Sequence, residues 1–146
     1  MSDEQDNIVS DLYDNYSETQ KEVLAIELRK TRNMLFYLAA IQLIGEWLSL
    51  VMVSMFTVEY ALIGMIVPIM LFSLAFLAMK EPMLSIVIAA VIIIGLWIYL
   101  ITLQPEFALK GWLARALMIF LLISGFQHAK EAMKIKRELK EKGINV

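Results

Sequence analysis

Apolar residues dominate four stretches of the chain, each long enough to cross a lipid bilayer as a helix. These stretches cover approximately residues 34–56, 60–79, 83–103 and 109–128. A bilayer core of about 30 Å and a helical rise of about 1.5 Å per residue require roughly 20 residues for each crossing. The pattern therefore predicts an all-α integral membrane protein with four transmembrane helices.

The connections between these stretches are short, which predicts an up-down-up-down bundle. Pro68 lies inside the second stretch, where a proline removes one backbone hydrogen bond and often kinks a helix. The third stretch is rich in β-branched residues that would also suit a buried strand. Its length favours a helix, because a solitary strand at that depth would leave its backbone without hydrogen bonds.

Charged segments flank the apolar stretches at both ends of the chain. Residues 1–16 are predicted to form an acidic flexible tail, and a capping-box pattern at Ser17 predicts the start of a helix. This helix is expected to continue into the first span, so that residues 17–128 form a four-span domain with a lead-in helix. Residues 129–146 are predicted to form a basic C-terminal helix that ends at Gly143. Spans one and four would therefore carry cytoplasmic helical extensions.

Composition supports the membrane class and excludes several kinds of chemistry. The 146 residues are 60% hydrophobic, and their mean hydropathy is +0.67, which is too apolar for one soluble core. Cysteine is absent from the sequence, so disulfides, thiol nucleophiles and thiolate metal sites are excluded. The single histidine, His128, marks the inner end of span four and offers neither a catalytic triad nor a metal cluster. We therefore expect no enzyme activity, no metal and no cofactor.

Basic residues gather on one side of the predicted membrane domain. They precede span one, separate spans two and three, and follow span four: Arg29, Lys30, Arg32, Lys80, Lys130, Lys134, Lys136 and Arg137. The opposite loops hold Lys110 and, farther in, Arg115. By the positive-inside rule both termini are expected in the cytoplasm, at the inner membrane if the host is a bacterium.

Three residues inside the predicted spans are intramembrane polar or coupling candidates. Gln42 and Glu46 are one helical turn apart in span one, and Arg115 lies in span four. Counted from the inner surface at about 1.5 Å per residue, Glu46 is about 16 Å deep and Arg115 about 20 Å. An acidic residue at that depth costs roughly 3 kcal/mol. One interpretation is a Glu46–Arg115 pair, supported by Gln42, that fixes which helices pack together.

Two alternatives for Glu46 remain open. It could bind a proton or a cation as the coupling site of a small transporter or channel subunit, or it could lie at an interface between subunits. A short four-span chain with one carboxylate midway along its first span resembles the small multidrug-resistance transporters. The resemblance implies proton-coupled transport of cations by a dimer, and it extends to Glu46 alone.

The basic C-terminal helix admits three interpretations. It could lie on the anionic inner leaflet, bind nucleic acid, or pair with the lead-in helix; interspersed glutamates and a lack of stacking aromatics argue against nucleic acid. Apolar residues at i, i+3 and i+7 favour the pairing, through Ala132, Ile135 and Leu139 on one helix and Val23 and Ile26, with Lys30, on the other. We expect a non-catalytic protein that forms a homo-oligomer or docks a membrane-protein partner through these helices, with Glu22, Glu27, Lys134 and Arg137 as interface candidates.

Overall fold

A computed structural model of the chain describes residues 2–52, 58–103 and 112–144. Over these ranges the structure is entirely helical. Its elements are α1 (Ser2–Met52), α2 (Val58–Leu77), α3 (Pro82–Leu103) and α4 (Trp112–Glu141). The four helices match the four apolar stretches of the sequence, and α1 and α4 extend beyond those stretches as predicted.

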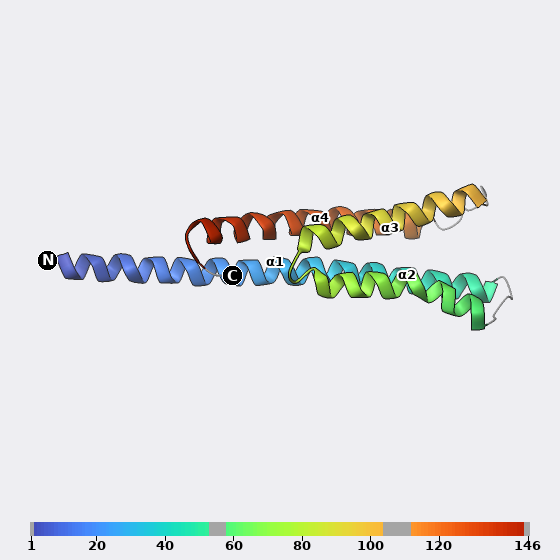
Figure 1. The fold of residues 1–146 in the computed structure, drawn as a ribbon, viewed down its shortest axis with the longest axis horizontal. Helices are drawn as coiled ribbons and strands as arrows, with labels where there is room; N and C mark the ends of the chain where they lie inside the picture. The colour runs from blue at the N-terminus through green and yellow to red at the C-terminus, as the bar shows by residue number, and fades with distance from the viewer. Residues whose placement is uncertain (1, 53–57, 104–111, 145–146) are drawn as a thin grey trace.

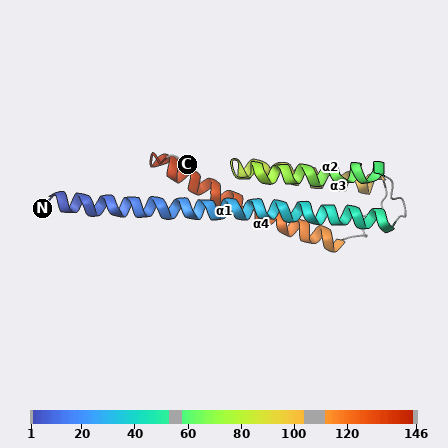
Figure 2. The ribbon, with the colours of Figure 1, turned by 90° about the horizontal axis from the view of Figure 1, so that it is seen from below.

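Consecutive helices run in opposite directions and form two layers, α1 with α2 and α3 with α4 (Figure 1). α1 contacts α2 and α4 most extensively, and α3 contacts both α2 and α4. Along its C-terminal half, α1 has α2 and α4 on different sides (Figure 2). The N-terminal part of α1 extends past the end of α4.

α1 begins at Ser2, and the helix predicted to start at Ser17 therefore starts much earlier. Residues 2–16 contain neither glycine nor proline, so nothing in the local sequence interrupts a helix there. Their acidic residues also lie near the helix N-terminus, where negative charge interacts favourably with the helix dipole. The capping-box pattern is consequently internal to α1.

The remaining described helix ends agree with the sequence. After α2, the backbone N–H groups of Lys80 and Glu81 both donate to the Leu77 carbonyl at 2.9 Å, and Pro82 begins α3. At the end of α4, Gly143 has a φ of +73°, which glycine adopts readily. The Ile144 N–H donates to the Leu139 carbonyl at 3.0 Å, so the helix closes with a Schellman motif.

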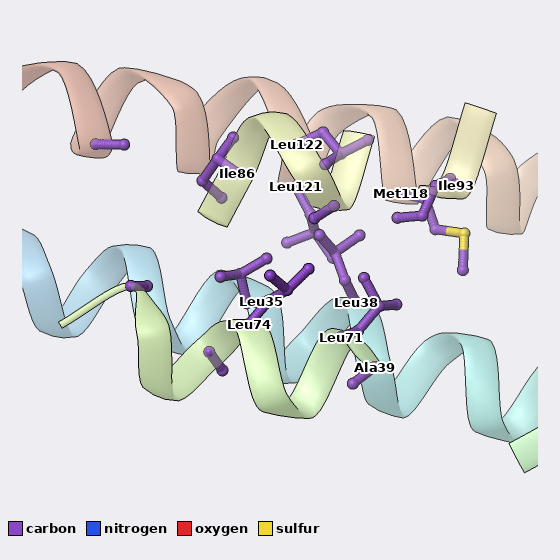
Figure 3. Close-up of a cluster of buried hydrophobic side chains, with 14 residues drawn as sticks. Leu35, Leu38, Ala39, Leu71, Leu74, Ile86, Ile93, Met118, Leu121 and Leu122 are labelled. Atoms are coloured by element: carbon purple, nitrogen blue, oxygen red, sulfur yellow. The ribbon is translucent and has the colours of Figure 1, made fainter. Parts of the chain in front are cut away.

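The main core lies between the four helices, where leucine and isoleucine side chains from all of them meet (Figure 3). Fully buried alanines, among them Ala39, Ala75 and Ala89, let the helices approach closely. Gly125 of α4 is also buried; a Cβ there would lie 2.8 Å from Ile86 Cδ1 of α3 and 3.5 Å from Met34 Cβ of α1. The bundle is therefore closely packed at this level.

A second cluster joins the extensions of α1 and α4. Its buried members are Leu24, Ala132 and Leu139, with Leu28, Ile135 and Ile144 packed around them. The predicted contact between the two charged segments is present, and the predicted α4 residues make it. The α1 residues differ from the prediction, because Val23 is 39% exposed and Ile26 is 50% exposed.

The continuity of α1 explains which of its faces meets α4. Farther along the helix, Leu35 and Leu38 belong to the main core. Leu24 and Leu28 continue the same face at alternating steps of three and four residues, whereas Val23 and Ile26 do not. An uninterrupted helix presents one face to its neighbour. Because Leu35 and Leu38 face the main core, Leu24, and not Val23 or Ile26, faces α4 in the extension.

Two of the described helices are long and apolar enough to cross a membrane by length and composition. These are α3 over Pro82–Thr102 and α4 over Trp112–Glu141, and α2 contains a shorter apolar segment, Gly64–Leu77.

Candidate functional site

Glu46 and Gln42 form one local polar group on α1. The Gln42 Nε2–H donates to Glu46 Oε1 at 3.0 Å. Gln42 is buried and Glu46 half-buried. The other carboxylate oxygen, Glu46 Oε2, lies 3.5 Å from the position that a Cβ on Gly64 would occupy. Glu46 therefore faces α2, at a place where a glycine leaves room for its carboxylate.

Arg115 lies elsewhere in the bundle. Its guanidinium carbon is 6.0 Å from the ring centroid of Trp97 on α3, at the outer limit of a cation–π contact. No ion pair joins Glu46 to Arg115 among the described residues. The structure thus brings Gln42 to Glu46, as predicted, but does not bring Arg115 to them.

The depth of each residue along its helix and the direction of its side chain explain why Arg115 does not reach Glu46. Met34 and Gly125 are close neighbours across α1 and α4. From this level Glu46 is about 18 Å along α1 and Arg115 about 15 Å along α4, at about 1.5 Å per residue. The two residues therefore have matching depths. Their faces do not match, because Glu46 is turned toward α2 and Arg115 toward α3.

A second polar group connects α1 with α4 where the bundle continues into the charged extensions. Glu27 is buried on α1, and its carboxylate accepts from Lys30 Nζ at 2.8 Å and from His128 Nδ1 at 2.6 Å. An ionised carboxylate only accepts, so the Nδ1–H of His128 is the donor. The buried Thr31 hydroxyl donates to the Glu27 backbone carbonyl at 3.0 Å. We call Glu27, Lys30 and His128 the junction cluster.

Opposing influences act on the pKa of Glu27. Burial tends to raise it, and the hydrogen bonds and positive charge of Lys30 and His128 lower it. The lowering prevails, so the pKa lies below the ordinary glutamate value and the carboxylate is ionised at neutral pH. The junction cluster is therefore a charged contact between the first and the last helix.

The sequence identified Glu27 as an interface residue and His128 as a helix-end marker, and it did not connect them. The sequence did contain a signal for the contact between Glu27 and His128. Glu27 lies between Leu24 and Leu28, on the face of α1 that continues into the core. A carboxylate on such a face needs a donor from the neighbouring helix, and His128 is the histidine that α4 supplies.

The other interface candidates lie on the outside of the extensions. Glu22, Lys134 and Arg137 are exposed, and Lys134 lies 4.0 Å from Glu138 one turn later. Lys136 makes a contact that the sequence did not indicate: its Nζ donates to the Lys80 carbonyl at 3.0 Å. This bond attaches α4 to the turn between α2 and α3.

Arg32 lies close to the same end of the bundle. Its guanidinium carbon is 5.8 Å from the Phe36 ring centroid. Its Nε is buried and has no hydrogen-bond partner among the residues that the structure describes. Within the same residues, no three histidine, aspartate or glutamate side chains are grouped so that they could hold a metal ion.

No protein-family model, no curated protein and no solved structure matches this chain.

Proposed function

We propose that this chain is a four-span integral membrane protein with a non-catalytic docking role. The main observation in favour of a membrane-spanning chain is the distribution of exposed large apolar side chains. All of those described, except Tyr16, Val23 and Ile26, lie within residues 37–51, 62–79, 84–101 and 112–126. Each helix contributes one of these ranges, so the exposed apolar surface surrounds the bundle as a belt.

The dimensions of the belt suit a lipid bilayer. Its span along α3, residues 84–101, corresponds to about 27 Å at about 1.5 Å per residue, close to a hydrocarbon core of about 30 Å. Only 22% of the apolar window of α3 is buried inside the bundle. A core helix of a soluble protein would be mostly buried, whereas lipid would cover this surface.

Charge distribution supports cytoplasmic termini. Arg29, Lys30, Lys80 and Lys130 lie close to one end of the belt, the end from which α1 and α4 extend. Basic residues concentrate on the cytoplasmic side of membrane proteins. Both extensions are therefore assigned to the cytoplasm, at the inner membrane in a bacterial host.

Cysteine accessibility tests this topology cleanly, because the sequence has no cysteine. We expect E18C and E141C to react with a membrane-impermeant maleimide only after cells are permeabilised. T57C and Q104C, between consecutive helices, are expected to react in intact cells. Labelling of E18C and E141C from opposite sides, or recovery of the chain in the soluble fraction without detergent, would contradict the topology.

The docking role is proposed from the way the extensions are built. Leu24 and Leu139 pack between them, and the Glu27–His128 bond fixes their relative position. Glu22, Lys134 and Arg137 remain exposed on their outer faces. A fixed pair of charged helices outside a membrane anchor presents a preformed surface to a membrane-protein partner or to another copy of the chain, at little ordering cost.

Site-specific photo-crosslinking in native membranes tests this role. A photoreactive residue at Lys134 or Arg137 is expected to give a discrete crosslinked product. The matched control is Leu117, which is exposed on the same helix but within the apolar belt, and is expected to react with lipid. Equal product patterns from all three positions would contradict docking through the extensions.

Transport is a second candidate function, and the surroundings of Glu46 favour it. The described hydrogen bond to the Glu46 carboxylate comes from the neutral amide of Gln42, with no ion pair to Arg115. A carboxylate inside the belt without a bonded cation among the described residues suits proton or cation coupling. In that case E46Q abolishes pH-dependent ligand binding without destabilising the bundle, while Q42L does not imitate it. A loss of stability without any binding defect would favour a purely structural Glu46.

A further inference from the structure

We propose that Arg32, Lys80 and Lys136 bind the phosphate group of an anionic phospholipid at the cytoplasmic end of the bundle. Arg32 lies on α1, Lys80 in the turn between α2 and α3, and Lys136 on α4. We call these three residues the cationic site. The inference goes beyond the docking role, and it rests on the proposed membrane topology, which places this end of the bundle at the inner leaflet.

The Arg32 guanidinium carries N–H donors that no described residue accepts. A guanidinium offers five such donors, and Arg32 makes neither a hydrogen bond nor an ion pair with the residues that the structure describes. Nε is its one buried nitrogen without a partner, so the two terminal nitrogens remain accessible. The Phe36 ring, 5.8 Å from the guanidinium carbon, packs beside it. The terminal N–H groups form a fork that matches two oxygens of a phosphate.

Two further cations lie close together at this end of the bundle. Lys136 Nζ donates to the Lys80 backbone carbonyl at 3.0 Å, and this neutral acceptor leaves the positive charge unbalanced. Glu81 is the neighbouring acidic residue, and in the described part of the chain it forms no ion pair with the cationic site. The carboxylate of the junction cluster is already bonded within that cluster. The cationic site therefore attracts an anion from outside the chain.

Contacts between aromatic rings place Arg32 near Lys80. The Phe36 ring centroid lies 4.9 Å from that of Phe72 and 5.8 Å from that of Phe76. Arg32 is about one turn before Phe36, and Lys80 is four residues after Phe76. Because α1 and α2 run in opposite directions, both cations lie beyond the ring contact on its cytoplasmic side. The cationic site therefore surrounds the cytoplasmic end of α2.

The depth of Arg32 matches the headgroup layer of a bilayer. On α1 the exposed apolar belt begins at Tyr37, which is about 7.5 Å from Arg32 at about 1.5 Å per residue. Headgroups extend roughly 5–7.5 Å beyond the hydrocarbon core on each side. A lipid phosphate in the inner leaflet would therefore lie at the level of the Arg32 guanidinium.

The surroundings of the site favour an anionic phospholipid over other phosphate compounds. Phe72 and Phe76 are 47% and 66% exposed within the belt, next to Phe36, so acyl chains can cover them while the headgroup reaches the cations. A zwitterionic headgroup would bring an additional positive charge to three that are already present. Basic pockets between transmembrane helices on the cytoplasmic side bind anionic headgroups in this way.

Native mass spectrometry of the full chain in detergent tests the site. Phosphatidylglycerol and phosphatidylcholine with identical acyl chains are added in equal amounts. The wild type is expected to retain one phosphatidylglycerol molecule in preference to phosphatidylcholine. Equal retention of the two lipids, or retention of neither, overturns the proposal.

Substitutions of arginine test which cation binds the phosphate. R32Q is expected to weaken phosphatidylglycerol binding by about tenfold or more, because it removes both the charge and the fork. R32K keeps the charge without the fork and is expected to give an intermediate affinity. R137Q is the matched control: it removes the same charge from an exposed position on α4, about 16 Å beyond the last belt residue, Phe126. Equal losses in R32Q and R137Q overturn the site.

K80Q keeps the test decisive if R32Q does not fold, which circular dichroism checks. The Lys80 side chain is exposed in a turn, and its backbone carbonyl remains available to Lys136. K80Q is expected to weaken phosphatidylglycerol binding by about fivefold, through the loss of one charge near the headgroup. An unchanged affinity in K80Q overturns the three-cation site.

Thermal unfolding distinguishes a phospholipid from a free phosphate ion. Phosphatidylglycerol is expected to raise the Tm of the wild type more than that of R32Q, and inorganic phosphate is expected to raise neither. Equal stabilisation by inorganic phosphate would assign the site to a soluble phosphate and overturn the lipid. The E18C and E141C labels in R32Q are expected to show the wild-type topology. Lost binding in a correctly inserted chain therefore concerns the cationic site, whereas an inverted label pattern in the wild type contradicts the topology itself.

Discussion

Alanine substitution of Glu27 and His128, singly and together, measures how strongly the junction cluster joins α1 to α4. The Glu27 side chain is 9% exposed and that of His128 is 27% exposed. Their 2.6 Å hydrogen bond involves a buried charge, and such bonds contribute about 1.5–3 kcal/mol. The Lys30 side chain is 47% exposed, so its bond adds less than about 1 kcal/mol.

From these values we expect E27A to lower the free energy of unfolding by about 2–3 kcal/mol. H128A should cost nearly as much, because it leaves a buried carboxylate with Lys30 as its remaining charged donor. The double variant should cost less than the sum of the two, with a coupling energy of about 1–2 kcal/mol. Denaturant unfolding in detergent micelles, followed by circular dichroism, provides the measurement.

E22A is the control for this cycle, since it removes the same charge from an exposed position of the same helix. It should change the free energy of unfolding by less than about 0.5 kcal/mol. Strictly additive effects of E27A and H128A would refute the reasoning, because they would show that the contact between the two side chains contributes nothing.

Two further predictions concern pH and packing. Because the pKa of Glu27 is lowered in the folded chain, its contribution to stability is complete above the ordinary glutamate value of about 4.3 and is lost as the pH falls through the lower folded value. Unfolding measured across that acidic range should therefore show a steeper loss for the wild type than for E27Q. G125A should cost about 1–3 kcal/mol, because its Cβ would lie 2.8 Å from Ile86 Cδ1, and I86V should restore part of this by removing that atom. The Cβ of G45A would meet nothing within 4 Å, so this variant should be neutral or stabilising. Denaturant unfolding in micelles measures both glycine variants, and a loss in G45A equal to that in G125A would refute the packing argument.

Local sequence determined the helical elements of this protein. Four long apolar stretches with short connections between them predict four helices, because a helix satisfies the polar backbone N–H and C=O groups of an apolar segment within that segment. Gly143 marks the end of α4, because a residue at positive φ closes a helix there. The start of α1 was misplaced at Ser17, because a capping-box pattern is also compatible with the interior of a helix when no glycine or proline precedes it.

Relative rotation of the helices was decided by tertiary structure alone. On α1, Val23 with Ile26 and Leu24 with Leu28 form two stripes that are equally plausible from spacing. The main core at Leu35 and Leu38 selects the second one. The same selection brings Glu27 against His128 and leaves Val23 and Ile26 exposed.

Glu46 and Arg115 illustrate the same distinction. Counting residues gives the depth of a side chain along a helix, because the rise per residue is constant. The direction in which that side chain points depends on how the helix is rotated against its neighbours. Packing of side chains far apart in the chain sets that rotation. Sequence thus determined the depth of both charges, and only the assembled bundle placed Glu46 toward Gly64 and Arg115 toward Trp97.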